Sequence, residues 1–288
     1  MIGLAGISAA AQSYESLGEG KYQFKAGCAT MIVDSRDGGK VVSYKCNDTE
    51  TLSTLQLSSY SYGSTFWISP QKTWNWPPVP EHDNLPYTVE ERANSVYMVS
   101  QISKKHPYKI TKEYSVDKKD NSIVVTYGVT NETGKECSIA AWEITRVPGA
   151  GVTFFDATPD AIEPTGNSRP GVEIDYRFGL AWFPYTVMSE QRKSNIDGKG
   201  WLAHARDGYL MVKKFDDIRA DQPAPGESEI QVYTHNDRTY IEIEGQGAYT
   251  TLKPGESLSW TVRWYLVPQK YAPLPSQELA DMVKAIVK

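Results

Sequence analysis

The stretch 240–246 (YIEIEGQ) places two carboxylates where they could move protons. The stretch alternates, so Glu242 and Glu244 are expected on one face of a strand, together with Tyr240. The two isoleucines between them would then face the core. Two strand rises separate the carboxylates by roughly 7 Å. Carboxylates at this distance suit general acid–base catalysis, and they are equally compatible with a solvated strand face that has no catalytic role.

The stretch 66–78 (FWISPQKTWNWPP) is the most distinctive loop of the chain. Prolines stiffen it, and its three indoles belong to Trp67, Trp74 and Trp76. Sugar rings carry patches of C–H groups that stack on indole faces, and Gln71 and Lys72 supply hydrogen-bond donors for hydroxyl groups. The loop therefore indicates a carbohydrate-binding surface. The alternative is a loop that closes the core with buried tryptophans.

The order of several motifs is similar to that of the aldose 1-epimerase (galactose mutarotase-like) superfamily. The strand that ends in Glu244-Gly245-Gln246, the turn 252–256 (LKPGE) and the last strand resemble the C-terminal end of those proteins. The stretch 125–146 resembles their strand, Thr-Asn turn and return strand. Over residues 22–267 the chain resembles more closely the DUF4380 family, a set of uncharacterised relatives of that superfamily. The matching pieces are Gly38-Gly39-Lys40, the loop 66–78, the stretch 200–203 (GWLA), Asp207-Gly208 and the C-terminal stretch.

The resemblance implies a catalytic base and leaves two assignments for the acid. Glu244 takes the position of the family's base, and Gln246 lies beside it. The family's catalytic histidine would fall on the strand 140–145, where this chain has Trp142 and Glu143 and no histidine. Either Glu143 replaces it, with a raised pKa in the cleft, or Trp142 faces the sugar and Glu143 points away, since neighbouring strand positions face opposite ways.

Three further residues complete the expected site. His82 follows the aromatic loop and is a second candidate for the acid, and His204 alternates with Leu202 on an expected strand that could line the same face. Arg146 would form an ion pair with one of the carboxylates. Each histidine has the alternative of a surface position or a hydrogen-bonded position in the core. The family's Leu-His-Gly-Gly element and the arginine of its sugar-binding loop are missing from the chain.

These features favour an exported carbohydrate-active protein that binds a mono- or oligosaccharide and epimerises it at the anomeric carbon. One alternative is a non-catalytic carbohydrate-binding protein of the same fold, and a weaker one is a glycoside hydrolase or lyase that uses paired carboxylates. No cofactor and no metal are expected, because the chain has no metal-ligand spacing, phosphate-binding glycine loop or Ser/His/Asp signature. Nothing in the sequence predicts an oligomeric state.

The composition and the N-terminus bear on the partners and the compartment. A net charge of −5 over 288 residues argues against nucleic acid and anionic membranes as partners. Residues 1–20 are expected to be a tail with a residual signal peptide, because residues 2–11 are small and apolar and the stretch 9–12 (AAAQ) resembles a cleavage site. The stretch is too short to span a membrane. We expect a periplasmic or secreted bacterial protein; the alternative is an ordinary apolar N-terminus.

The cysteines allow a bridge between consecutive strands. Cys28 and Cys46 could form a disulfide in an oxidising compartment, and buried, unpaired thiols are the alternative. Because the chain has 3 cysteines, at least one of them is unpaired.

Turn signals separate β-rich runs at intervals of about ten residues, with no βαβ alternation. The pattern predicts an all-β, antiparallel supersandwich as one domain over residues 21–288, with a short C-terminal helix in 271–288 capped by Ser276. The expected strands are 23–34, 41–46, 65–68, 95–103, 108–116, 122–130, 137–147, 152–156, 176–184, 201–206, 209–215, 229–234, 240–244, 248–252 and 258–267.

Overall fold

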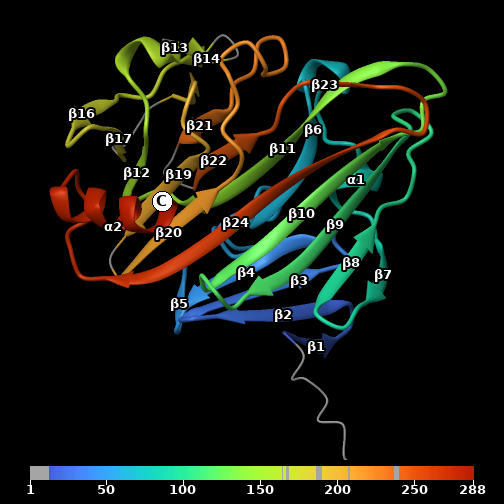
Figure 1. Cartoon of the computed structure of the whole chain (residues 1–288), viewed down its shortest axis with the longest axis horizontal. Coiled ribbons are helices and arrows are strands. Elements are labelled where there is room, and N and C mark those ends of the chain that lie inside the picture. The colour runs from blue at the N-terminus through green and yellow to red at the C-terminus, as the bar shows by residue number, and fades with distance from the viewer. Residues whose placement is uncertain (1–12, 164, 167–168, 186–189, 207, 237–239) are drawn as a thin grey trace, which may run out of the picture.

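Two large antiparallel sheets form the body of the molecule, and the all-β prediction is confirmed (Figure 1). The computed structural model describes residues 13–163, 165–166, 169–185, 190–206, 208–236 and 240–288. The 12-stranded sheet contains, in spatial order, β1 (Tyr14–Gly18), β2 (Lys21–Ala26), β3 (Ala29–Asp34), β4 (Lys40–Cys46), β6 (Ser64–Ser69), β11 (Cys137–Pro148), β22 (Tyr240–Gln246), β21 (Ile230–Thr234), β18 (Arg192–Ile196) and β13 (Ile162–Glu163), with β5 (Thr49–Glu50) paired to β4 and β23 (Thr250–Leu252) paired to β11.

The second sheet covers one face of the first. The 10-stranded sheet contains, in spatial order, β16 (Asp175–Arg177), β17 (Leu180–Pro184), β12 (Val152–Phe155), β19 (Trp201–Arg206), β20 (Gly208–Lys214), β24 (Ser257–Gln269), β10 (Ser122–Asn131), β9 (Tyr108–Asp117), β8 (Ser95–Val99) and β7 (Thr88–Glu91). The remaining described elements are the pair β14 (Thr165–Gly166) and β15 (Arg169–Pro170), the 3-10 helices η1 (Gln71–Thr73) and η2 (Pro159–Ala161), and the helices α1 (Pro80–Asp83) and α2 (Gln277–Val287).

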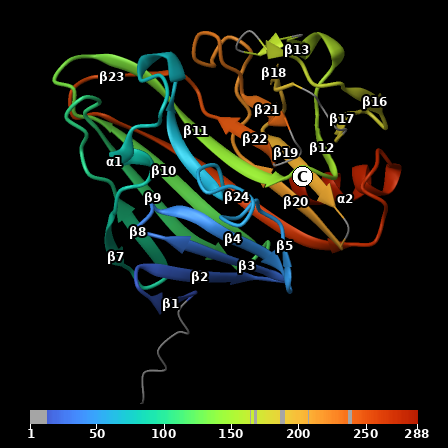
Figure 2. The ribbon, with the colours of Figure 1, turned by 180° about the vertical axis from the view of Figure 1, so that it is seen from behind.

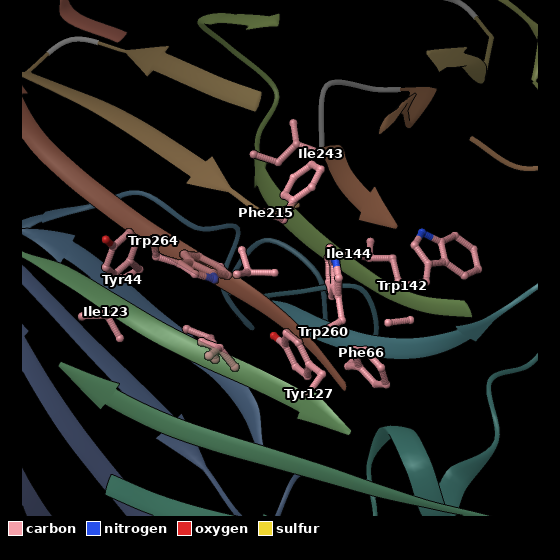
Figure 3. Close-up of a cluster of buried hydrophobic side chains, with 14 of the residues drawn as sticks. Tyr44, Phe66, Ile123, Tyr127, Trp142, Ile144, Phe215, Ile243, Trp260 and Trp264 are labelled. Carbon is pink, nitrogen blue, oxygen red and sulfur yellow. The ribbon is translucent and has the colours of Figure 1, made fainter. Parts of the chain in front are cut away.

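Alternating apolar residues of the central strands build the core between the sheets. In β10, Ile123, Val125 and Val129 are fully buried, and Tyr127 is 2% exposed, as the alternation predicts. The ring of Tyr127 stacks on the ring of Phe66 from β6, with centroids 4.4 Å apart (Figure 3). Residues such as Phe66 therefore define the inner face of the 12-stranded sheet, and their neighbours along each strand point to the opposite, outer face.

The structure corrects several expected strand boundaries. The expected strand 23–34 is a hairpin, because the backbone turns at Gly27, which has a φ of 57°. The expected strand 176–184 is likewise divided into β16 and β17 by a turn at Phe178 and Gly179. Strand β1 lies within the stretch 1–20, for which we expect a tail, and it pairs with β2 in the 12-stranded sheet. Strand β18 was not predicted at all.

The C-terminal helix is confirmed, and it is shorter than the range 271–288. Ser276 caps it by accepting a hydrogen bond from the backbone N–H of Leu279 at 3.3 Å. Leu279, Ala280 and Val283 are fully buried in a cluster with residues of β12, β17, β19 and β20, such as Trp182. Helix α2 therefore covers the 10-stranded sheet on the side away from the core between the sheets (Figure 1). Within the described residues, no helix is long and apolar enough to cross a membrane.

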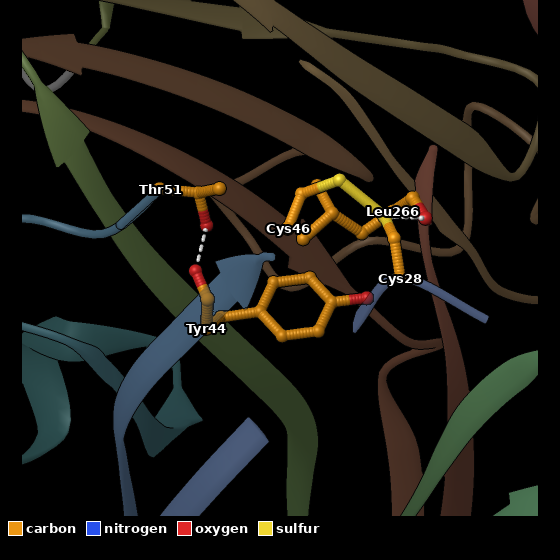
Figure 4. Close-up of a disulfide and its surroundings, with 5 residues drawn as sticks. All are labelled: Cys28, Tyr44, Cys46, Thr51 and Leu266. Carbon is orange, nitrogen blue, oxygen red and sulfur yellow. Dashed lines mark hydrogen bonds between the residues drawn. A yellow bond between two sulfur atoms is a disulfide. The ribbon is translucent and has the colours of Figure 1, made fainter. Parts of the chain in front are cut away.

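A disulfide joins Cys28 to Cys46 across the β3–β4 hairpin (Figure 4). The two Cα atoms are 5.0 Å apart, within the range that a bridge requires. Of the two alternatives, the structure therefore has the bridged pair, and Cys137 is a free thiol.

Removing this bridge is expected to destabilise the fold without changing it. The bridge closes a loop with a sequence separation of 18 residues, for which chain entropy predicts a loss of roughly 3 kcal/mol in the double variant Cys28→Ser, Cys46→Ser. Urea unfolding under non-reducing conditions measures the change, and Cys137→Ser serves as the control. Equal unfolding midpoints for the double variant and the control would contradict the prediction.

Candidate functional site

A pocket of about 440 Å³ opens on the outer face of the 12-stranded sheet. Its volume lies in the range of roughly 300–1,000 Å³ that is typical of small-molecule sites. Among the described residues it is lined by Ser61, Trp67, Gln71, Trp76, Trp142, Arg169, Gln191, Lys193, Tyr233, His235, Tyr240 and Glu242. The lining therefore combines aromatic faces with a few charged groups, which is the composition expected for a polar ligand with apolar faces.

The strand register explains why these residues meet. Directly opposed residues of antiparallel strands project from the same face. Trp67 of β6 is opposite Trp142 of β11, and Glu242 of β22 is opposite Tyr233 of β21. Tyr233 is in turn opposite Lys193 of β18. Five adjacent strands thus bring their outward residues to one surface, and Figure 2 shows β6, β11 and β22 side by side at its centre.

Hydrogen bonds and ring contacts fix the aromatic side chains of the pocket in place. The indole of Trp67 donates a hydrogen bond at 2.7 Å to Asp83 of α1, whose carboxylate also accepts one from Thr65. The Trp67 ring meets the rings of Trp142 and Trp76 edge-on, with centroids 5.3 Å and 6.2 Å apart. Packing and hydrogen bonding together fix the orientation of the indole faces before any ligand arrives.

Two ion pairs cross the floor of the pocket. Arg146 and Glu242 form the first, with Nε and Oε1 2.8 Å apart, and the guanidinium lies over the Trp67 ring. Lys193 and Glu244 form the second, in which the ammonium donates to both carboxylate oxygens at 3.2 Å. The predicted pairing of Arg146 is therefore with Glu242 rather than with Glu143 or Glu244.

Glu244 lies directly beneath the pocket and does not line it. Its side chain is fully buried, and its Oε2 accepts a hydrogen bond from the indole of Trp142 at 2.8 Å. Trp142 and Lys193 both line the pocket, so they separate the carboxylate from it. Burial raises the pKa of the Glu244 carboxyl to about 7, and Lys193 opposes that rise. A carboxyl with this pKa is able to exchange protons near neutral pH.

Gly245, which follows Glu244 in β22, lets the strand pack closely against the core at this point. Gly245 points to the inner face, where a β-carbon would lie 2.9 Å from the ring of Phe215. Glycine thus allows β22 to pack closely at this point. Gln246, next on the outer face, is fully buried and donates to Gln231 at 3.3 Å. It supports the floor, and it is not among the lining residues.

Glu143 lies on the opposite side of the sheet from the pocket. It is fully buried between the sheets, where it forms an ion pair with Lys213 of β20. Tyr127 and Trp264 donate hydrogen bonds to its Oε1 at 2.5 Å and 3.2 Å. Of the two alternatives for this strand, the structure has Trp142 toward the pocket and Glu143 away from it, because adjacent strand residues alternate.

The two predicted histidines also lie outside the pocket. His82 is buried on α1, and its Nε2 is 3.1 Å from the carbonyl oxygen of Tyr108. His204 is fully buried in the 10-stranded sheet, with Nδ1 3.0 Å from the hydroxyl of Thr153. Burial lowers their pKa values to about 4 and about 3, so both rings are neutral at physiological pH. Both occupy the core positions that were the alternative interpretation.

The aromatic loop divides between the pocket and the core. Trp67, Trp76 and Gln71 line the pocket, whereas Trp74 is buried and donates from its indole to the carbonyl of Ile68 at 2.8 Å. Lys72 is exposed on η1 and does not line the pocket. Some members of the loop therefore line the pocket, and Trp74 packs in the core; that the loop binds a carbohydrate stays a prediction.

Several pocket residues were missed in the sequence. Lys193 lies in the unpredicted strand β18, and Gln191 directly precedes that strand. Tyr233 lies within the expected strand 229–234 and His235 directly follows it, so both alternate in phase with Gln231, which is opposite Glu244. This alternation is the feature of the sequence that could have identified Tyr233 and His235 as pocket residues. Among the described residues, no group of three or more His, Cys, Asp or Glu side chains is placed to hold a metal ion.

Comparison with known proteins defines the fold class: this chain has the galactose mutarotase-like fold. It superposes on a galactose mutarotase-like protein from Lactobacillus casei with a TM-score of 0.58 at 14% identity, covering 86% of this chain and 100% of that one. A candidate aldose 1-epimerase from Escherichia coli gives 0.62 at 12% identity, covering 86% and 99%. A galactose mutarotase-like protein from Clostridium acetobutylicum gives 0.53 at 14% identity, covering 89% and 98%.

The same comparison at the level of sequence gives no match. No family model matches the chain, and no curated protein does so either. The supersandwich prediction is therefore confirmed by structure, and membership of the DUF4380 family stays a prediction.

Proposed function

We propose that this protein binds a sugar in the pocket and interconverts its anomers by proton transfer. The observation that carries the proposal is the floor of the pocket, where Lys193 and Trp142 face the ligand space and both hydrogen-bond to the buried carboxylate of Glu244. Aromatic walls suit the C–H faces of a sugar, and the fold is shared with galactose mutarotase-like proteins.

The base in this proposal is the Glu244–Lys193 pair. Mutarotation requires removal of the proton from the anomeric hydroxyl and protonation of the ring oxygen, after which the ring opens, C1 turns and the ring closes again. Lys193 passes one of its protons to Glu244 and takes the proton of the anomeric hydroxyl, so the net result is a protonated Glu244. The raised pKa of Glu244 makes this transfer feasible near neutral pH.

His235 is the residue that we assign to the acid. Its Nδ1 donates to the carbonyl oxygen of Asn236 at 2.6 Å, and because a carbonyl only accepts, the proton given to the ring oxygen comes from Nε2–H of the ring that carries both protons. Its ring stacks on Tyr240, with centroids 5.1 Å apart, and lines the pocket. Lys193 is opposite Tyr233, two residues before His235, which corresponds to roughly 7 Å along the strand. The two groups would thus flank a sugar ring.

A non-catalytic sugar-binding protein is the second candidate. The observation that favours it is that Glu244 is fully buried and its carboxylate oxygens already accept hydrogen bonds from Trp142 and Lys193. A carboxylate held in this way would fix the floor of the pocket without taking part in chemistry. The paired-carboxylate hydrolase or lyase is less favoured, because Glu242 lines the pocket and Glu244 does not.

We propose that the protein acts outside the cytoplasm, in the periplasm or as a secreted protein. The disulfide between Cys28 and Cys46 supports this proposal, since such bridges persist in oxidising compartments. Residues 1–12, which carry the signal-peptide interpretation, lie outside the described residues. Fractionation of the native host cells tests the proposal, which fails if the protein is found in the cytoplasm.

A binding screen followed by anomer exchange tests the main proposal. Monosaccharides and a glycan array are screened first, and NMR exchange spectroscopy then measures the rate between the α and β anomers of each hit. We expect binding together with an exchange rate above that of the buffer. Binding without acceleration would select the non-catalytic candidate, and the absence of any sugar ligand would reject both.

A further inference from the structure

An exposed aromatic platform extends the pocket at one edge. Trp76 lines the pocket and is nevertheless 57% exposed, and Tyr60 beside it is 52% exposed. Their ring centroids are 5.6 Å apart. Large aromatic side chains are seldom left this exposed in pairs, and an exposed apolar patch next to a pocket usually marks part of a binding surface.

The platform is built from two loops that are fixed at their ends. Tyr60 belongs to a loop closed by a backbone hydrogen bond from Gly63 to Ser53 at 2.7 Å. Trp76 follows η1 and meets the Trp67 ring edge-on at 6.2 Å. Asn75 precedes it with a φ of 57°, a conformation that asparagine tolerates better than most residues. The indole is therefore supported from one side by an aromatic ring of the pocket and remains open to solvent.

We infer that the ligand is an oligosaccharide, with one sugar ring in the pocket and the next ring on the Trp76–Tyr60 platform. This inference rests on the proposed function. Exchange at the anomeric carbon requires a free anomeric hydroxyl, so the ring in the pocket is the reducing end, and the preceding ring of the chain lies on the platform. A single free sugar held against Trp67 and Trp142 would leave the exposed ring of Tyr60, which does not line the pocket, uncovered.

The free reducing end of such a ligand indicates the class of reaction that supplies it. Reducing ends are produced when a glycosidic bond of a polysaccharide is broken by a hydrolase, and each cleavage by a hydrolase releases a single anomer at first. A protein that equilibrates the anomers of such fragments would act directly after that cleavage.

Isothermal titration with three sugar series tests the inference: glucose, cellobiose and cellotriose; galactose, galactobiose and galactotriose; and galacturonic acid with its di- and trimer. In the series that binds, we expect the disaccharide to bind roughly tenfold more tightly than the monosaccharide. Tyr60 belongs to the platform and is not among the residues that line the pocket, so Tyr60→Ala should remove most of that difference and leave the affinity for the monosaccharide within about twofold. Tyr60→Phe should retain the difference.

The control is Tyr176→Ala, which removes an exposed aromatic side chain from β16 in the other sheet. Equal affinities for one and two rings, or an equal loss for both in Tyr60→Ala, would overturn the inference while the proposed function stands. If none of the sugars binds to the wild type, and the glycan array gives no ligand either, then the proposed function itself fails.

Discussion

Replacement of Glu244 by glutamine is expected to slow anomer exchange by roughly 10²- to 10⁴-fold, the usual contribution of a general base. Glutamine keeps the shape of the side chain and can still accept the hydrogen bond from Trp142, so the floor of the pocket should remain in place. Sugar affinity should therefore change little. NMR exchange spectroscopy measures the rate, and isothermal titration measures the affinity.

Glu242→Gln is the matched control for this variant, because Glu242 is on the same strand face and lines the pocket. Loss of its ion pair with Arg146 should weaken sugar binding and leave the exchange rate at saturating sugar close to that of the wild type. An exchange rate for Glu244→Gln within about threefold of the wild type would exclude Glu244 as the base.

The pH dependence of the same rate provides an independent check. Burial raises the pKa of Glu244 to about 7, and the base is active only without its proton. The rate at saturating sugar should therefore be low in acid and rise as the pH increases through about 7. Glu244→Gln should lack this rise. A flat profile for the wild type between roughly pH 5 and 9 would contradict the assignment.

The largest effect on stability is expected from Lys213→Met. This change leaves the carboxylate of Glu143 buried between the sheets without its cation, and breaking a buried ion pair typically costs about 3–5 kcal/mol. Because a domain of this kind is stable by only about 5–15 kcal/mol, the loss is a large fraction of the total. Urea unfolding followed by tryptophan fluorescence measures it.

The double variant Lys213→Met, Glu143→Gln separates the charge effect from a packing effect. Removing the orphaned charge should restore most of the lost stability, since a neutral amide is far cheaper to bury than a carboxylate. A double variant no more stable than Lys213→Met would show that packing, rather than charge, dominates at this position.

Much of the fold followed from alternation along single strands. Strand β10 and its orientation were predicted from the alternation of Ile123, Val125, Tyr127 and Val129. The terminal helix was predicted from its N-cap, Ser276, and the apolar residues at helical spacing that follow. Boundaries failed where a strand-like run contains a turn, as at Gly27, because apolar residues continue on both sides of it.

The sequence predicts on which face of a strand each site residue lies, because that depends on the strand alone. Alternation placed Glu242 and Glu244 on a common face, and the structure confirms this. It does not reveal the depth of a side chain, which depends on neighbouring strands: Glu244 is covered by residues of β11 and β18. The contribution of Lys193 was missed because β18 has little apolar periodicity of its own.

Strand β6 serves two purposes at adjacent positions, since Phe66 stacks in the core while Trp67 forms part of the pocket. A substitution that shifts this strand would disturb both at once, so its sequence is constrained by folding as well as by ligand recognition. Tyr60 and Trp76, which lie in loops, are free of that double constraint. Diversification of ligand preference among descendants of this sequence should therefore proceed through the loops, while the strands that carry the floor change slowly.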